Sequence, residues 1–276
     1  MKRVAIVGLG LIGGSLGLSL KRKLSGVHVL GVDFAAVLAA RQARGAADEL
    51  VDAADDQAVL RAAESAELVV LATPVSAVIR ALPALLERAQ VVTDCGSTKR
   101  AIVAATANVA RRGRFVPGHP MAGRAGAGVE QASAEIFERR PWILCPDSSD
   151  KDAEALVEQM VRAVGAEPVR MSAEDHDRAV AITSHVPQLL ASALAVLAQR
   201  RDADRSAGPA FESATRVAGG AESMWRDIFA TNADEIVRAL DELVAVLGNA
   251  AHDLDDKADN ALALLREARR VRGGGD

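Results

Sequence analysis

The stretch that decides the fold is VAIVGLGLIGGSLGLSL, which spans residues 4–20. It begins with a short apolar run of the kind that forms a strand buried on both faces. Gly8, Gly10 and Gly13 follow and open an apolar helical segment, and in this strand–turn–helix context a G-x-G-x-x-G pattern binds a dinucleotide. The first glycine permits the tight turn, the second lets the backbone approach a pyrophosphate, and the third lets helix and strand pack closely. We therefore expect a dinucleotide at the N-terminus of this helix, where the helix dipole favours an anion.

An aspartate at the end of the next apolar run supports this prediction. Asp33 lies 20 residues beyond Gly13, where a carboxylate accepts hydrogen bonds from both ribose hydroxyls of an adenosine and repels a 2′-phosphate. This favours NAD over NADP, although Arg41 and Arg44 follow and soften the negative field. The other interpretation is a glycine-rich turn with an ordinary aspartate at a strand end. The expected cofactor-binding residues are Gly8, Gly10, Leu11, Ile12, Gly13, Asp33, Thr73 and Pro74.

Short apolar runs alternate with helical segments as far as about residue 146. This alternation is typical of parallel strands joined by crossover helices, and it predicts an α/β fold with a Rossmann-type doubly wound parallel sheet. Thr73, Pro74 and Ser97 directly follow two of the expected strands, so we expect them at the carboxyl edge of the sheet, where open α/β sheets bind ligands. The expected strands are residues 4–8, 27–33, 67–72, 90–95, 114–118 and 141–146.

Past residue 171 the sequence pattern becomes helical. We expect two domains, a dinucleotide-binding domain over residues 1–171 and an all-helical domain for substrate binding and dimerisation over residues 172–276. Residues 187–198 are apolar nearly all round, which predicts a helix buried on every side. Residues 236–247 carry an apolar stripe with a period of 3.6, and such a stripe needs a partner helix from this chain or from a second subunit.

Composition excludes several classes of protein. A chain of 276 residues with 50% hydrophobic and 25% charged residues can bury a core, which excludes global disorder. A net charge of −4 and 3% aromatic residues argue against nucleic acid as a partner.

Cys95 and Cys145 stand apart, with no histidine at ligand spacing, so we expect no metal site. The N-terminus resembles a signal peptide or membrane anchor, but glycines interrupt it and residues 21–23 are basic, so we expect a cytoplasmic protein without a membrane partner.

A histidine follows the expected strand at residues 114–118. His119 lies in the sequence GHPMAG, at the same predicted edge of the sheet. A neutral imidazole, with an ordinary pKa of about 6.5, can accept the proton of an alcohol as hydride leaves for a nicotinamide. The other interpretation is a histidine that only satisfies hydrogen bonds in a turn.

Several motifs in order along the chain resemble one enzyme family. They are the glycine stretch above, LATPV (71–75), TDCGSTK (93–99), GHPMAG (118–123), TSHVPQ (183–188), ATRVA (214–218) and MWRDIFATN (224–232). Over about residues 3 to 250 the chain resembles the TyrA family of prephenate and arogenate dehydrogenases. The order of these motifs carries the resemblance, because the glycine pattern alone is common to many dinucleotide enzymes.

The resemblance implies an NAD-dependent oxidative decarboxylation in tyrosine biosynthesis, in which prephenate becomes 4-hydroxyphenylpyruvate. It implies that His119 takes the proton of the ring hydroxyl and that Ser97 orients the imidazole and the substrate. Arg216 would bind a substrate carboxylate, for which a planar guanidinium is suited. His185 and Gln188 would line the cleft from the helical domain. Without the resemblance, Arg216 would be interpreted as a solvated surface charge and His185 as a histidine bonded to backbone at a helix entry.

Three departures from the family pattern concern the substrate. Arg124 and Ala125 stand where many relatives carry Thr or Ser and then an acid, Gln188 stands where prephenate-preferring members often carry His, and Glu212 is an acid where a base can occur. The side chain of prephenate carries a keto group and that of arogenate an amine, so these positions leave arogenate dehydrogenase and dual cyclohexadienyl dehydrogenase open as alternatives. We rank prephenate first, and we count Arg124 among the substrate-binding residues.

The resemblance also implies a homodimer formed through the helical domain. The competing enzymes are β-hydroxyacid dehydrogenases and ketopantoate-type reductases, which depend on a catalytic lysine in their helical domain. Lys151 and Lys257 are the only lysines after residue 150, and neither is in an apolar helix, which argues against that class. A non-catalytic NAD-binding sensor remains the more remote alternative.

Overall fold

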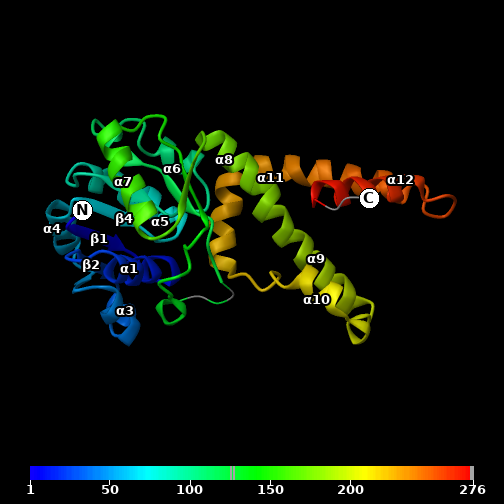
Figure 1. The fold of residues 1–276 in the computed structure, drawn as a ribbon, viewed down its shortest axis with the longest axis horizontal. Helices are drawn as coiled ribbons and strands as arrows, with labels where there is room; N and C mark the ends of the chain where they lie inside the picture. Colours follow the sequence, from blue (N-terminus) through cyan, green and yellow to red (C-terminus); the bar gives the residue numbers. More distant parts are fainter. Residues whose placement is uncertain (125, 127, 274–276) are drawn as a thin grey trace.

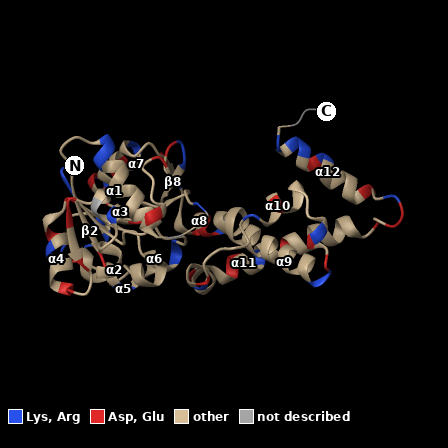
Figure 2. Ribbon diagram, turned by 90° about the horizontal axis from the view of Figure 1, so that it is seen from below, with Lys and Arg blue, Asp and Glu red and all other residues tan. Residues whose placement is uncertain are grey.

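The computed structural model describes residues 1–124, 126 and 128–273. All described strands lie in the N-terminal part of the chain, which ends with a strand at Arg170, and helices alone follow from Ala173 onward. Figure 1 shows the sheet-containing part at one end of an elongated molecule and the helices extending from it as two arms. In the view of Figure 2, basic and acidic residues are interspersed on both parts.

The main sheet has six parallel strands in the order β3-β2-β1-β4-β5-β6. The chain moves outward from β1 to β3 and then returns to the other side of β1 with β4, so the strand order reverses between β1 and β4. Open α/β sheets bind ligands at such a reversal. The parallel strand order confirms the predicted doubly wound sheet. The strands are β1 (Arg3–Val7), β2 (His28–Asp33), β3 (Glu49–Asp52), β4 (Leu68–Leu71), β5 (Val92–Asp94) and β6 (Phe115–Val116).

Helices cover both faces of this sheet. Along β1, Val4 and Ile6 belong to the hydrophobic cluster formed with α1 and α7, whereas Ala5 belongs to the cluster formed with α4 and α5. Alternate residues of a strand point to opposite faces, so an uninterrupted apolar run is what a doubly covered strand requires. The helices of this part are α1 (Leu11–Lys23), α2 (Ala35–Leu38), α3 (Arg41–Ala46), α4 (Asp56–Ser65), α5 (Val75–Leu86), α6 (Arg100–Ala104) and α7 (Lys151–Ala163), with short 3-10 turns at Arg112–Arg114 and Val129–Gln131.

One of the two edge strands of this sheet, β3, was not predicted from the sequence. β3 reads ELVD, and none of its four residues is buried. A short edge strand with charged ends lacks the continuous apolar run that identified the other strands.

Two sequence expectations are corrected by a second, three-stranded sheet. It consists of β7 (Gly118–Pro120), β8 (Pro141–Leu144) and β9 (Glu167–Arg170), with β7 antiparallel and β9 parallel to β8. Residues 141–146 therefore do not join the parallel sheet, and His119 lies within a strand rather than on a loop beyond one. The predicted strand at 114–118 divides at Pro117, which has no N–H to donate to a ladder. A buried apolar run looks the same in sequence whichever sheet it joins.

The helical part begins with one long continuous helical segment. In this segment α8 (Ala173–Val180) passes through a π-helical turn, η3 (Ala181–His185), into α9 (Val186–Arg200). A 3-10 turn at Asp204–Ser206, α10 (Pro209–Thr215), α11 (Glu222–Ala251) and α12 (Asp259–Val271) follow. α11 bends at Asn232, whose φ of −141° and ψ of 24° are not helical. The all-helical second half is thus as predicted.

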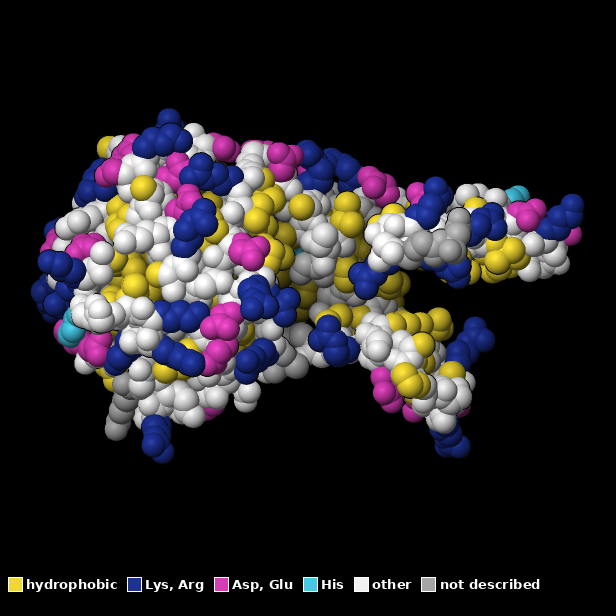
Figure 3. Space-filling model, viewed as in Figure 1, with side chains coloured by type: hydrophobic (Ala, Val, Ile, Leu, Met, Phe, Trp, Pro, Cys, Tyr) yellow, Lys and Arg dark blue, Asp and Glu magenta, His cyan; other side chains and the backbone are white. Residues whose placement is uncertain are grey.

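The prediction that residues 187–198 are buried on every side is wrong for the single chain. Only Val186, Gln188 and Ala191 of α9 are buried, while Leu190 is 48% and Leu197 53% exposed. On α11, Ile236 is buried but Val244 is 66% exposed. The two arms diverge from the body of the molecule, so no other described element covers these faces, and Figure 3 shows hydrophobic side chains along both arms.

By length and composition alone, Ala173–Arg200 is apolar enough to cross a membrane. Its first half, however, carries His176, Asp177 and His185, which are buried polar residues. His176 and Asp177 form hydrogen bonds with the N-terminal part of the chain. The apolar character of the segment thus comes from its second half, α9, which has an apolar face exposed in the single chain.

Candidate active site

The glycine turn after β1 has the geometry that a dinucleotide requires. Gly8 has a φ of +95°, and a Cβ on it would lie 2.7 Å from the carbonyl oxygen of Ala72. A Cβ on Gly13 would lie 1.8 Å from the carbonyl oxygen of Gly8, so both positions exclude a side chain. By contrast, a Cβ on Gly10 would meet nothing within 4 Å, so that position lies open to an approaching group. The three glycines therefore fit a pyrophosphate at this turn.

The helix that follows fits the same interpretation. α1 begins after Gly10, which is its N-cap, and its first turn carries no acidic residue that would repel an anion. Leu11 and Ile12 form that first turn and are half-buried. Thr73 packs close to Gly8 from the end of β4, and Pro74 is the exposed N-cap of α5. Gly8 and Thr73, which follow β1 and β4, thus lie close together where the strand order reverses.

Asp33 ends β2 and holds the glycine turn in place. Its Oδ2 accepts a hydrogen bond of 2.7 Å from the backbone N–H of Leu9, and its Oδ1 accepts one of 2.7 Å from that of Phe34. Each carboxylate oxygen has a second lone pair, so the residue can still accept bonds from ribose hydroxyls. Arg41 begins α3 and is exposed, and the side chain of Arg44 lies outside the described residues.

His119 occupies the centre of β7 and is half-buried. Its Nδ1 lies 2.8 Å from Nε2 of His176, and Nδ1 of His176 lies 2.8 Å from Oδ1 of Asp177. Burial lowers the pKa of His119 well below its usual value, and the positive charge of Lys99 lowers it further. Burial likewise lowers the pKa of His176. Both imidazoles are therefore neutral at pH 7, as a general base requires.

Asp177 joins the two parts of the chain. It lies on α8, and its Oδ1 accepts a hydrogen bond of 2.7 Å from the N–H of Lys99, while its Oδ2 accepts one of 3.0 Å from the N–H of Arg100. Burial would raise the pKa of this carboxyl, but the bonds from His176 and from those two backbone groups outweigh burial and hold the pKa below its usual value. Asp177 is thus an ionised carboxylate inside the protein.

A buried ion pair lies under the loop that carries Ser97. Lys99 and Asp94 are fully buried and paired with each other. Asp94 also accepts hydrogen bonds from the N–H of Gly96, at 2.8 Å, and from the N–H of Gly118, at 3.0 Å. This carboxylate therefore ties the Ser97 loop to the strand that carries His119. Ser97 itself is half-buried in that loop.

His185 and Gln188 lie on the helical part, in the π-helical turn and in the first turn of α9. His185 is buried in the π-helical turn, 5.9 Å from the ring of Trp225 in an edge-to-face contact, and its Nδ1 lies 3.3 Å from Nδ2 of Asn232. Burial lowers the pKa of His185 to about 4. The same amide of Asn232 donates to the carbonyl oxygen of Asp177 at 2.9 Å. Gln188 is buried close to Gly220, where a Cβ would lie 3.3 Å from its Nε2.

The remaining predicted substrate residues are not joined to this cluster. Arg216 follows α10 and is exposed, and within the described residues no hydrogen bond or ion pair connects it to His119. Arg124 is exposed, and its Nη2 donates a hydrogen bond of 3.3 Å to Oγ of Ser133. Glu212 is exposed on α10. Ala125 lies outside the described residues. The roles of Arg216 and Arg124 therefore stay predictions.

Sequence reasoning missed the polar residues that support His119. His176 and Asp177 lie in the segment AEDHDRAV, which resembles the solvated start of a surface helix. Asp94 and Lys99 belong to TDCGSTK, where an aspartate at the end of a buried strand was the available signal. Asn232 ends MWRDIFATN, a motif that served only for the family resemblance.

Comparisons with known proteins agree with this geometry. Residues 16–170 match the family described as prephenate dehydrogenase, nucleotide-binding domain, and residues 172–267 match prephenate dehydrogenase, dimerization domain. The chain is 31% identical to prephenate dehydrogenase of Bacillus subtilis, over 98% of this chain and 75% of that protein. It is 32% identical to cyclohexadienyl dehydrogenase of Zymomonas mobilis, over 98% of this chain and 95% of that one.

A solved structure covers the whole chain. It is that of prephenate dehydrogenase from A. aeolicus in complex with hydroxyphenyl propionate and NAD+. It superimposes with a TM-score of 0.85 at 28% identity, over 100% of this chain and 99% of that one. The chain therefore belongs to the prephenate dehydrogenase family of oxidoreductases.

Proposed function

We propose that this protein catalyses the NAD-dependent oxidative decarboxylation of prephenate to 4-hydroxyphenylpyruvate. The observation that carries the proposal is a neutral, half-buried imidazole, that of His119, on a strand tied through Asp94 to the loop of Ser97. In the reaction the ring hydroxyl loses its proton and its carbon gives hydride to NAD+. The ring carboxylate then leaves as carbon dioxide, the ring becomes aromatic, and the ring oxygen takes up a proton to give the phenol.

The cofactor would bind along the turn after β1. Gly8, Gly10 and Gly13 with the first turn of α1 (Leu11 and Ile12) would hold its pyrophosphate, and Asp33 its adenosine ribose. Thr73 and Pro74 would form the wall on the β4 side. When bound, NAD+ supplies the acceptor for the hydride.

The protein's own groups would handle the proton and the substrate. His119 accepts the hydroxyl proton, since burial keeps it unprotonated at neutral pH. Ser97 orients imidazole and substrate from the adjoining loop. His185 and Gln188 would line the substrate cleft from the helical part, with Arg216 as the partner of a carboxylate and Arg124 at the rim. We take residues 1–171 as the dinucleotide-binding domain and 172–276 as the helical domain.

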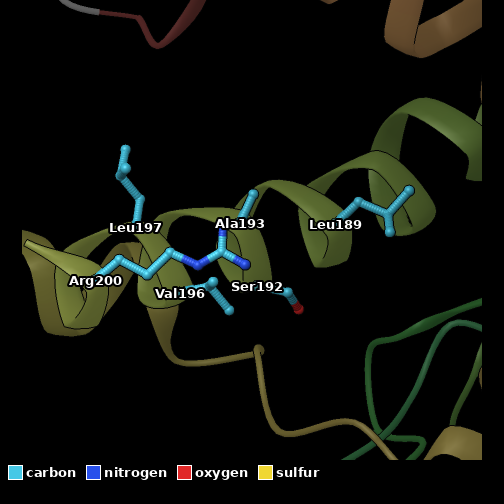
Figure 4. Close-up of a pocket in the computed structure, with 6 residues that line it drawn as sticks. All are labelled: Leu189, Ser192, Ala193, Val196, Leu197 and Arg200. Atoms are coloured by element: carbon cyan, nitrogen blue, oxygen red, sulfur yellow. The ribbon is translucent and has the colours of Figure 1, made fainter.

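We propose further that the protein is a homodimer formed through its helical part. A hollow of about 520 Å³ lies along one side of α9, lined by Leu189, Ser192, Ala193, Val196, Leu197 and Arg200 (Figure 4). A second copy packed here and on α11 would cover the exposed apolar faces, which supports a cytoplasmic enzyme rather than one bound to a membrane. The match of residues 172–267 to a dimerization domain supports the same assembly.

The test is a comparison of rates on prephenate and on arogenate with NAD+, followed through NADH absorbance. We expect prephenate to be the faster substrate and His119→Asn to abolish most of the rate. Faster turnover of arogenate would favour the second candidate, an arogenate or dual cyclohexadienyl dehydrogenase, which the identity to the Zymomonas enzyme supports. Normal NAD+ binding without turnover of either substrate would instead indicate a sensor.

A further inference from the structure

An imidazole acts as a base only through its unprotonated nitrogen, and the partner of the other nitrogen decides which one that is. In this chain the partner of Nδ1 of His119 is not a carboxylate or a carbonyl group but a second histidine, His176, which is fully buried. The proton arrangement of His119 therefore depends on that of His176.

The hydrogen bonds that link these residues determine where each proton lies. Asp177 is ionised and can only accept, so Nδ1 of His176, 2.8 Å away, carries a proton. A neutral His176 then has a bare Nε2, which must accept, so Nδ1 of His119 donates to it. A neutral His119 with a proton on Nδ1 has a bare Nε2.

We infer that His176 and Asp177 are a positioning pair that fixes His119 in its Nδ1–H tautomer and so makes Nε2 its basic nitrogen. The catalytic consequence of this inference rests on the proposed function, whereas the tautomer does not. A second residue that holds the tautomer of a catalytic histidine is a common device in hydrolases, where a carboxylate does this directly. Here the carboxylate acts through an intervening imidazole.

The surroundings of the pair support the assignment. Lys99 donates to Asp94 and Arg100 donates to Asp177 and Asp234, so the cations next to the histidines are paired with carboxylates. The ring of His185 contacts the amide of Asn232 and so does not take the place of Asp177 as the partner of His176. Asp177 accepts backbone N–H bonds from the residues just beyond the Ser97 loop, so the orientation of His176 is set by both parts of the chain.

Two variants of His176 separate positioning from space filling. His176→Leu removes the acceptor and keeps a similar volume, whereas His176→Gln can place an amide oxygen near the position of Nε2. The exposed His252→Gln is the matched control. The measurements are kcat and KM for prephenate, the Kd of NAD+, the melting temperature, and the 15N shifts of the His119 ring at pH 7.5, assigned with His119→Asn.

We expect wild-type His119 to be protonated at Nδ1. In His176→Leu we expect a shift toward the Nε2–H tautomer and a fall of kcat on the order of a hundredfold, with KM and NAD+ affinity within about threefold. His176→Gln should recover most of the loss, and His252→Gln should match the wild type.

The inference is overturned if wild-type His119 carries its proton on Nε2, a result that needs no variant to fold. It is also overturned if folded His176→Leu keeps both the wild-type tautomer and the wild-type kcat. If the wild type turned over neither prephenate nor arogenate, the proposed function would fail, and the ring shifts would still decide the tautomer.

Discussion

The N-terminal and helical regions of the chain cover their apolar residues in different ways. In the N-terminal region, strands such as β4 are fully buried between two hydrophobic clusters, one on each face of the sheet. In the helical region, by contrast, a small cluster surrounds Trp225, and α12 has no buried residue at all. The N-terminal region thus buries its own core, whereas the helical region leaves apolar faces exposed in the single chain.

The residues of the proposed active site are divided between the same two regions. The N-terminal region contributes His119, the Ser97 loop and the glycine turn, while the helical region contributes His176, Asp177 and His185 at the junction. This division leads to four predictions, which concern the chemical step, the stability and assembly of the two regions, substrate affinity, and sensitivity to acid.

The largest effect should come from His119. Replacing it with Asn removes the base without adding charge or bulk, and we expect kcat to fall by about 10²- to 10⁴-fold. The Kd of NAD+ should hardly change, because the glycine turn follows β1 and Asp33 ends β2, whereas His119 lies on β7. Steady-state kinetics and NAD+ titration check this, and an unchanged kcat would remove His119 from the mechanism.

The second prediction compares substitutions of two leucines, one buried and one exposed. Leu82 on α5 is fully buried, and Leu82→Ala should lower the free energy of unfolding by about 2–5 kcal/mol at every protein concentration. Leu197 on α9 is 53% exposed in the single chain, so Leu197→Glu should leave a folded protein that associates weakly. Chemical denaturation and sedimentation measure the two quantities.

The two leucines also test the proposed dimer directly. If wild-type protein sediments as a monomer at micromolar concentrations, or if Leu197→Glu dimerises as well as the wild type, then α9 is not the covered face. Leu82→Ala serves as the control, because it changes stability without touching the exposed helical surface.

Arg216 should show a third, smaller effect of a different kind. Arg216→Ala would remove the proposed charge-assisted contact to a substrate carboxylate, and we expect KM for prephenate to rise about ten- to a hundredfold with kcat nearly unchanged. The exposed Arg226→Ala, on α11, is the control. A KM that stays at the wild-type value would return Arg216 to the solvated surface.

How much of this could be predicted from the sequence depends on how local the cause is. The glycine turn was predictable because the positive φ of Gly8 and the close contact of Gly13 with the carbonyl of Gly8 both arise within a single strand–turn–helix unit. The edge strand β3 and the second sheet were not, because ELVD lacks an apolar run and PWIL does not encode which sheet it joins. The domain boundary near residue 171 stays a prediction.

The support of His119 was unpredictable for a different reason. His176 and Asp177 are 57 and 58 residues from His119 in sequence, and their charged neighbours indicate solvent. They are buried because α8 packs against α6, α11 and the residues just beyond the Ser97 loop. Conversely, Leu190 and Leu197 suggested complete burial because apolar composition does not reveal whether the cover comes from the same chain.

The smallest expected effect is a loss of stability in mild acid, centred on the junction of the two regions. Burial lowers the pKa of His185 to about 4 in the folded protein, against about 6.5 when unfolded, so the unfolded chain binds more protons between these values. Stability from this residue is therefore intact above pH 6.5 and declines as the pH falls toward 4. Lowering the pH from 7 to 5.5 should cost about 1 kcal/mol through His185 alone. Thermal and urea unfolding at the two pH values measure this loss of stability. His185→Gln should make the loss smaller, whereas the control His252→Gln, at an exposed site, should leave it unchanged. Equal pH dependence in all three proteins would place the acid sensitivity elsewhere than at this junction.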